Sequence, residues 1–298
     1  MTAPRSSAAG ADWRAVLALI GSMASLATGA SFAKQLFAQV GASGTTLLRV
    51  GFAALLLLAF WRPWRVRWDA AHLRWIALFG AVLGSMNLCF YLSLRTIPLG
   101  VAVALELSGP LAVAVLTSHR RRDLVWVACA ALGIGLLLPV WRFATPLDAA
   151  GVALALGAGA FWAAYILVGQ RAARVHPGPG LAWAMSAAAL VALPFGGSSA
   201  GGALLQPSML LAGLALAVLS SAIPYSLEMY ALRRLPAPTF GVLLSLEPAL
   251  GALAGLLFLG ERLQPLQVLA IVCVIAASAG MALGGRNGEP PAIGPDPP

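Results

Sequence analysis

The stretch VAVALELSGP, residues 101–110, sets one carboxylate, Glu106, in an otherwise apolar run that ends at Pro110. Burying an unpaired carboxylate among apolar side chains costs several kcal/mol, because the charge loses its hydration. A glutamate at this place therefore has either a structural partner or a function. Which of the two applies depends first on whether the run lies inside a membrane.

The amino-acid composition indicates that this run lies inside a membrane. Of the 298 residues, 60% are hydrophobic and 10% are charged, and the mean hydropathy is +0.88, whereas a soluble domain is roughly 45–50% apolar and about 25% charged. A helix needs about 20 apolar residues to cross a hydrocarbon core about 30 Å thick. We predict an all-α membrane protein with ten transmembrane helices. The predicted spans are residues 13–33, 45–61, 73–95, 99–118, 122–140, 147–168, 180–197, 208–231, 237–259 and 264–285.

The distribution of basic residues predicts the orientation of these spans. A net charge of +9 and a pI near 10.7 would suit a nucleic-acid partner only if the basic residues formed one patch. They lie instead in the connections between spans. With a cytoplasmic N-terminus, 14 of the 19 Lys and Arg residues fall on the cytoplasmic side and four on the other, as the positive-inside bias requires. We expect a multi-pass protein in a lipid bilayer, with both termini cytoplasmic and no nucleic-acid partner.

The two ends of the chain differ from the spans. Residues 1–12 are expected to be a flexible N-terminus, and the Pro-rich tail at 286–298 is expected to be disordered. Arg5 and Arg14 precede the first apolar run, which also fits a cleaved secretory signal. Against that reading, the run is long and Lys34 follows it, and its removal would invert the charge distribution.

Parts of the first half of the chain recur in the second half. LRTIP at 94–98 returns as LRRLP at 232–236, an offset of 138 residues, and the same offset places Pro110 on Pro248. Internal similarity of this kind indicates a repeated structural unit.

The repeat divides the chain into two five-helix units. AVLGS at 81–85 is also echoed by AVLSS at 217–221, at an offset shorter by two residues. The predicted units are residues 13–140 and 147–285. Because each unit crosses the membrane an odd number of times, the two are inverted relative to each other, as in many secondary transporters, whose substrate sites lie near the midplane between the halves.

Small residues recur at every fourth position in the first span of each unit. Side chains of this size let helix backbones approach closely in lipid, so both spans are expected to pack tightly against neighbours. The positions are Gly21, Ser25 and Gly29 in the first unit, and Gly151, Ala155, Gly159 and Ala163 in the second.

Prolines interrupt matched spans of the two units. Proline lacks the N–H that would bond to the carbonyl four residues back, so Pro110 is expected to free the carbonyl of Glu106 itself. Pro248 is expected to free that of Leu244, and Pro224 that of Ser220. At this depth such carbonyls are tolerated only against protein or a wet cavity.

Two acids accompany these prolines. Glu106 and Glu247, the latter in LLSLEPALG at 243–251, lie about eight and ten residues into their spans, where a charged residue is by default a functional-site hypothesis. We expect both to face one interior cavity, holding the amino group of a substrate or a coupling proton. Structural hydrogen bonds to Ser108 or Ser245, or pairing with a nearby cation, stay open as the alternative.

Further polar and aromatic residues are candidates to line the cavity. Lys34 or Arg49 together with Glu106 would bind the two charges of a zwitterionic amino acid. Glu228 is instead assigned to a salt bridge with Arg233 or Arg234. The remaining candidates are Ser31, Asn87, Tyr91, Ser108, Trp162, Tyr165, Tyr225 and Ser245.

Other classes of function are less consistent with the sequence. No metal site or cofactor is expected, because Cys89, Cys129 and Cys273 show no ligand spacing and the three histidines fall in loops. An enzyme would need a nucleophile with its base, or a metal set. A channel would also carry intramembrane charge, but pores usually present rings of it from several subunits.

Three long segments carry a family resemblance. IPLGVAVALELSGPLAVAVLTSHRRRDLVWV at 97–127, LALGAGAFWAAYILVGQRA at 154–172 and IPYSLEMYALRRLPAPTFGVLLSLEPALGALAGLLFLGERLQPLQ at 223–267 resemble the amino-acid exporters of the EamA-type family, in the drug/metabolite transporter superfamily. The resemblance implies a bacterial inner-membrane secondary transporter that exports small neutral amino acids such as threonine and homoserine by alternating access, driven by protons. Another metabolite or a drug is the alternative substrate. The resemblance transfers no site residues.

Overall fold

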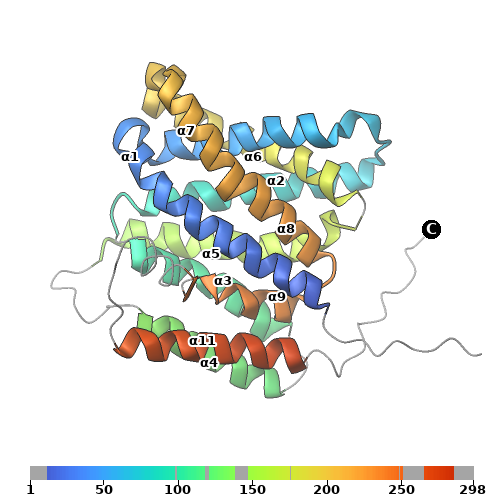
Figure 1. Cartoon of the computed structure of the whole chain (residues 1–298), viewed down its shortest axis with the longest axis vertical. Helices are drawn as coiled ribbons and strands as arrows, with labels where there is room; N and C mark the ends of the chain where they lie inside the picture. Colours follow the sequence, from blue (N-terminus) through green and yellow to red (C-terminus); the bar gives the residue numbers. More distant parts are fainter. Residues whose placement is uncertain are drawn as a thin grey trace, which may run out of the picture.

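The computed structural model describes residues 12–97, 99–117, 121–137, 147–174, 176–247, 249–250 and 265–284. Within these ranges all regular structure is helical and no strand occurs, which confirms the all-α prediction. Figure 1 shows the helices running in broadly similar directions, stacked from α7 at one end of the molecule to the α4–α11 pair at the other. The N-terminal residues 1–11, the tail 285–298 and Pro248 lie outside the described residues.

The first two predicted spans form one element, α1 (Trp13–Trp61). Asp12 caps its start by accepting a hydrogen bond from the Arg14 backbone N–H over 3.1 Å. The predicted spans 13–33 and 45–61 correspond to the two parts of α1, which a kink at Gly41, with φ 71° and ψ 175°, separates. This left-handed φ is accessible to glycine without steric cost. A single residue therefore separates residues 13–40 from 42–61.

The next elements form the middle of the bundle. α2 packs against α5 and α6, α3 packs against α5, and α1 packs against α6. A 3₁₀ turn, η1 (Pro63–Arg65), follows α1, and another, η3 (Gly201–Leu205), follows α6. The helices are α2 (Ala70–Ser93), α3 (Leu99–Leu116), α4 (Arg121–Leu137), α5 (Ala149–Ala172) and α6 (Pro177–Ala200).

The eighth predicted span is continuous but irregular. It consists of α7 (Pro207–Ala217), a π-helical turn η4 (Val218–Ala222) and α8 (Ile223–Leu232). In Figure 1 the three form one rod beside α1, with which all three are in contact. α9 (Ala237–Leu244) and α11 (Pro265–Gly284) complete the described helices.

Several helices are long and apolar enough to cross a membrane. The outer surface carries strongly exposed apolar side chains, such as Leu116 (83%) and Phe60 (76%), which suits contact with lipid and not with water. Further apolar helices in the described part of the chain are shorter. The five long stretches are Gln39–Arg65, Ala70–Ser93, Ala149–Ala172, Pro177–Leu205 and Pro207–Leu232.

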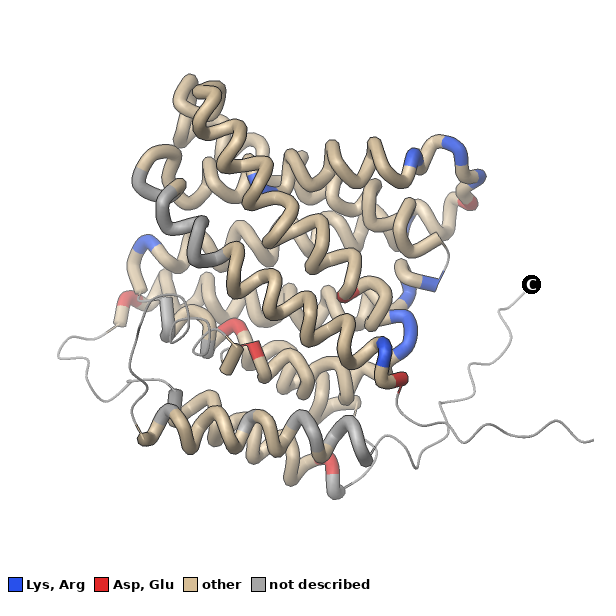
Figure 2. The backbone as a smooth tube through the Cα atoms, in the orientation of Figure 1, with Lys and Arg blue, Asp and Glu red and all other residues tan. Residues whose placement is uncertain are grey.

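Basic residues are unevenly distributed over the bundle. Figure 2 shows most Lys and Arg residues at one end of the helices, at the right of the view, around the α1–α2 and α8–α9 connections. This end also holds the start of α1, where Asp12 forms a salt bridge of 3.2 Å with Arg234. Among the described residues, the two ends of the bundle therefore differ in charge.

The small-residue stripes lie at close helix contacts. A Cβ added at Gly29 would come within 2.8 Å of the Ser220 Cβ, so α1 lies directly on the π turn. A Cβ added at Gly159 would come within 2.8 Å of the carbonyl oxygen of Glu106, so α5 lies directly on α3. Close approach was predicted for both stripes, and at these two glycines the prediction is confirmed.

Candidate functional site

Arg49 lies at the centre of the buried polar residues. It projects from residues 42–61 of α1 and is only 6% exposed. One terminal guanidinium nitrogen donates a hydrogen bond to the Asn87 side-chain oxygen, and the guanidinium carbon lies 5.5 Å from the centre of the Tyr91 ring. Among the described residues, its Nε has no hydrogen-bond partner. The guanidinium therefore retains one unused donor in a dry environment.

Asn87 and Tyr225 fix the orientation of that guanidinium. The Asn87 amide nitrogen donates to the carbonyl of Leu83 over 2.8 Å and to the Tyr225 hydroxyl over 3.3 Å. Both donors of the amide are thus engaged, and its oxygen is left to accept from Arg49. Asn87, Tyr91 and Tyr225 were all predicted to line one cavity, and the structure gathers them around Arg49.

The two predicted acids face the same region from α3 and from the residues after α9. Glu106 is 9% exposed, and it interacts electrostatically with both Glu247 and Arg49. Glu247 is half-buried. Neither side chain lies fully on the outer surface. The bundle interior therefore contains two carboxylates and a guanidinium near enough to influence one another.

The backbone at Glu106 is closely packed. Pro110 lies inside α3, as predicted, and the carbonyl of Glu106 rests against Gly159 of α5. A Cβ at Gly109 would in turn collide with the carbonyl oxygen of Gly159. The unpaired carbonyl is thus covered by protein, one of the two environments that such a carbonyl tolerates in a membrane.

The π turn changes the hydrogen-bond register just before Pro224. In the π turn, the N–H of Ile223 bonds to the carbonyl of Val218, five residues back. In this register, Pro224 also leaves the Leu219 carbonyl without a backbone donor. The hydroxyl of Ser25 supplies the missing hydrogen bond to the Leu219 carbonyl over 2.6 Å.

Ser108 and Ser245 bond to their own helices. The Ser108 hydroxyl donates to the carbonyl of Leu105 over 2.5 Å, and the Ser245 hydroxyl donates to that of Val242 over 2.5 Å. Ser108 is also exposed. The structural alternative, in which these hydroxyls bond to the glutamates, does not agree with these contacts.

Glu228 is a third buried acid, and its predicted role is wrong. It accepts hydrogen bonds from the hydroxyls of Ser22 (2.8 Å) and Tyr165 (2.7 Å) and is 7% exposed. Arg234, one of its two predicted partners, pairs with Asp12 instead. Tyr165, predicted to line the substrate cavity, is thus bound to Glu228.

The remaining predicted residues contribute less to this site. Trp162 is buried in the apolar core on α5, 8% exposed. The side chains of Ser31 and Lys34 lie outside the described part of the structure, although both residues belong to α1. Of the two predicted cations, Arg49 has a described side chain, and it interacts electrostatically with Glu106.

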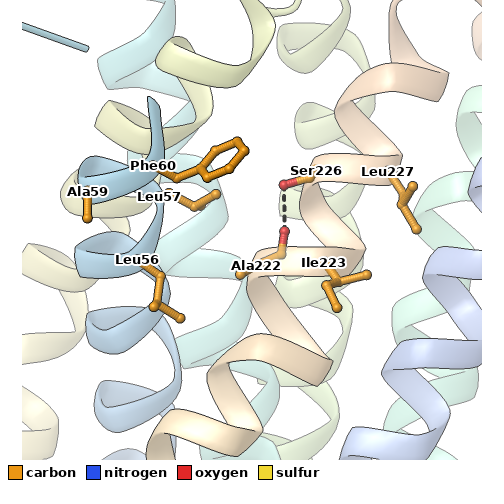
Figure 3. A pocket seen from close by; sticks show the side chains of 8 residues that line it. All are labelled: Leu56, Leu57, Ala59, Phe60, Ala222, Ile223, Ser226 and Leu227. Atoms are coloured by element: carbon orange, nitrogen blue, oxygen red, sulfur yellow. Dashed lines mark hydrogen bonds between the residues drawn. The ribbon is translucent and has the colours of Figure 1, made fainter. Parts of the chain in front are cut away.

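A groove of about 640 Å³ lies elsewhere, between α1 and α8 (Figure 3). The one hydroxyl among its lining side chains, that of Ser226, donates to the carbonyl of Ala222 over 2.5 Å, and none of the eight lining residues is charged. Such a surface suits hydrocarbon and not a charged solute. The lining residues are Leu56, Leu57, Ala59, Phe60, Ala222, Ile223, Ser226 and Leu227.

A bundle of apolar helices around a buried cation and buried acids is typical of membrane transporters of polar solutes. Comparison with known proteins identifies the family. Residues 149–283 match the EamA-like transporter family. The chain is also 51% identical to threonine/homoserine exporter RhtA of Salmonella typhimurium (strain SL1344), covering 91% of this chain and 92% of that one. RhtA of Escherichia coli (strain K12) is likewise 51% identical, covering 92% and 93%.

The chain belongs to the EamA-like transporter family, and it is therefore a transporter and not an enzyme. This confirms the resemblance seen in the sequence. A crystallised protein of 19% identity superposes with a TM-score of 0.72, covering 91% of this chain and 97% of the other. At this identity the superposition shows that the two share a fold.

Proposed function

We propose that the protein exports small neutral amino acids of the threonine and homoserine type across the bacterial inner membrane. The relatives carry these substrates in their names and align with nearly the whole chain. The observation that carries the proposal is the buried Arg49, with an unused Nε donor, in electrostatic contact with Glu106. A zwitterionic amino acid carries a carboxylate and an ammonium group, which are opposite in charge to Arg49 and Glu106.

The two charges of the substrate would be divided between these residues. A guanidinium offers a planar fork of donors that matches a carboxylate, so Arg49 would bind the substrate carboxylate through its Nε edge. Glu106, with Glu247 nearby, would accept hydrogen bonds from the substrate ammonium. Asn87 and Tyr225 would hold the guanidinium in position.

Transport would proceed by alternating access between two inverted five-helix units, residues 13–140 and 147–285, which together span the membrane ten times. The packing supports this arrangement. α2 packs against α5 and α6. The counterpart of α2 in the second unit is the rod of α7, η4 and α8, and this rod packs against α1. The third span of each unit thus packs against the first two spans of the other unit, as expected for inverted repeats.

Proton coupling would use the same acids, because an intramembrane carboxyl group can release its proton when water reaches it and take it up again. The end of the bundle that is rich in basic residues (Figure 2) would face the cytoplasm. Both termini would then lie on the cytoplasmic side.

Growth protection and vesicle transport test this proposal together. Cells producing the protein are expected to tolerate toxic concentrations of homoserine or threonine but not a panel of cationic dyes. In proteoliposomes, homoserine loaded on the far side should accelerate uptake of labelled homoserine, which a carrier does and a channel does not. Protection against dyes alone would instead support the alternative, a drug exporter.

Arg49 provides the residue-level test. Arg49→Lys keeps the charge but loses the planar fork, and Arg49→Met removes both. We expect homoserine counterflow to fall about 10-fold or more for the lysine variant, since a hydrogen bond to a charged group contributes about 1.5–3 kcal/mol, and to disappear for the methionine variant. Arg95→Lys changes an exposed arginine and serves as the matched control. Equal counterflow in all four proteins would contradict the proposed role of Arg49.

A further inference from the structure

Glu228 is a buried acid that the proposed substrate contacts do not use. Its two carboxylate oxygens have separate donors, the Ser22 hydroxyl of α1 at 2.8 Å and the Tyr165 hydroxyl of α5 at 2.7 Å. Glu228 itself belongs to α8, and Ser22 is completely buried. One carboxyl group therefore joins three helices, and it bridges the two five-helix units, because α1 belongs to the first and α5 and α8 to the second.

The described groups that surround Glu228 do not include a cation that pairs with it. The titratable groups that face it electrostatically are Tyr165 of α5, Tyr225 of α8 and Glu247 beyond α9. Of the other elements packed on α8, α6 carries no titratable residue in its sequence. Arg49 of α1 acts on Tyr225 instead. In the part of the chain that the structure describes, no salt bridge reaches Glu228.

A carboxylate ion in these surroundings would be poorly stabilised. Two hydroxyl donors replace only part of its hydration, and a neighbouring acid adds repulsion, so the ion would cost several kcal/mol to bury without a cation. The neutral acid carries no such cost and can still accept both hydrogen bonds. A proton on Glu228 would therefore favour the observed packing of α1, α5 and α8.

We propose that Glu228 is a second proton site of this transporter, separate from the Arg49–Glu106 substrate site, and that its proton holds α1, α5 and α8 together in the state observed. When these helices separate and water enters, the carboxyl O–H bond breaks and the proton passes to water. The carboxylate that remains disfavours reclosure until a proton returns. This inference rests on the proposed function, since the proton is meant to drive export.

The second site is linked to the first through aromatic and polar contacts. The rings of Tyr165 and Tyr225 lie 6.2 Å apart between centres, and the Tyr225 hydroxyl accepts from Asn87, which in turn holds Arg49. A change of protonation at Glu228 can therefore displace the ring that borders the substrate site. This provides a physical route between proton release and substrate release.

Infrared titration of the purified protein tests the site without any substrate. A protonated carboxyl group has a carbonyl stretch that its ion lacks. We expect the wild-type protein at neutral pH to show a buried carboxyl band that is missing from Glu228→Gln, an isosteric variant that keeps hydrogen-bonding groups at the same place. Identical carboxyl bands in the two proteins would overturn the proposal, whatever the protein transports.

Transport measurements test the coupling. In proteoliposomes, Glu228→Gln is expected to retain homoserine counterflow within about twofold of wild type. Accumulation of homoserine driven by a proton gradient should be at least about 10-fold lower than in wild type. The rate of transport should no longer depend on pH. A wild-type pH profile in this variant would refute the coupling role. Absence of homoserine counterflow in the wild type would instead refute the proposed substrate and leave the infrared result to decide on the proton site.

Two further variants separate a proton site from a structural contact and serve if Glu228→Gln does not fold. Tyr165→Phe and Ser22→Ala each remove one donor to the carboxyl group and keep the acid. Both are expected to displace the pH profile of gradient-driven transport by about half a unit or more, because a donor stabilises the ion more than the neutral acid. Lower counterflow with an unchanged pH profile in both variants would mean that Glu228 only stabilises the packing.

Discussion

The Asn87 side-chain amide donates a hydrogen bond to the Tyr225 hydroxyl over 3.3 Å, linking α2 to α8. The two residues are 138 positions apart, the same offset that relates LRTIP at 94–98 to LRRLP at 232–236. The bond thus joins the third predicted span to the eighth, which hold the same place in the two predicted units. Because the oxygen of the same amide accepts from Arg49, the position of the guanidinium depends on contact between the two halves of the chain.

Asn87→Asp is expected to inhibit substrate binding by occupying Arg49. The substitution is isosteric and sets a carboxylate beside the guanidinium, where it would form a salt bridge and compete with the substrate carboxylate. We expect the KM for homoserine to rise about 10-fold or more, which corresponds to about 1.4 kcal/mol, with little change in protein yield. Tyr225→Phe removes the hydrogen bond to Asn87 but adds no charge, so a smaller increase is expected. An unchanged KM in Asn87→Asp would contradict the role given to Arg49.

Glu106→Gln is expected to abolish proton-driven efflux while the protein still inserts and folds. The amide keeps the size of the side chain but cannot carry a negative charge toward a substrate ammonium. A hydrogen bond to a charged group contributes about 1.5–3 kcal/mol, so binding should weaken about 10-fold to 150-fold. Gradient-driven homoserine efflux from proteoliposomes measures the effect. Ser108→Ala is the control, because that hydroxyl is exposed and bonds only within its own turn; efflux through this variant should match wild type.

The sequence predicts the location of the site better than its contacts. Depth in the membrane identifies Glu106, and polarity within a span identifies Asn87, because both follow from the cost of burying polar groups. The importance of Arg49 does not follow, since a cation within a span gives no indication of its partner. The structure shows that partner to be an amide on α2, 38 residues away.

The error at Glu228 has a geometric cause that the sequence contains. On an α-helix, residues three and four apart are neighbours on one face. Arg233 and Arg234 lie five and six residues beyond Glu228, so they point in other directions. The actual partners, Ser22 and Tyr165, lie 206 and 63 residues away. Tertiary contacts at such separations do not follow from periodicity.

The offset between the two halves changes along the repeat. The offset between the halves changes from 136 residues at AVLGS, 81–85, to 138 at LRTIP, 94–98, so the second half contains two additional residues in this interval. The π turn, Val218–Ala222, lies at the start of this interval and closes a hydrogen bond over five residues instead of four. Sequence alone places the insertion but does not show that it is absorbed within a helix.

Ser25 and Pro224 are expected to be energetically coupled. Ser25→Ala removes the donor to the Leu219 carbonyl and should destabilise the protein by about 1–3 kcal/mol, the cost of an unsatisfied buried polar group. Pro224→Ala restores a backbone N–H near that carbonyl, so the loss of the Ser25 hydroxyl should then cost less. A double-mutant cycle on thermal unfolding in detergent measures this coupling. Ser186→Ala is the control, because that hydroxyl donates to Ala182, a carbonyl of its own helix; additive effects of the Ser25 and Pro224 substitutions would contradict the assignment.

The contact between α3 and α5 is expected to tolerate no added methyl group at Gly159. A Cβ there would lie 2.8 Å from the Glu106 carbonyl oxygen and 3.2 Å from the Ser108 hydroxyl, so Gly159→Ala must push α3 away from α5. Overpacking of this kind costs about 1–3 kcal/mol, and because the carbonyl belongs to Glu106, transport should fall as well. Gly157→Ala, on the same helix with open space around the added Cβ, should be neutral or slightly stabilising, since alanine favours the helix. Thermal unfolding and homoserine counterflow measured on both variants compare them directly, and equal stability of the two would show that α3 and α5 can separate at this point at no cost.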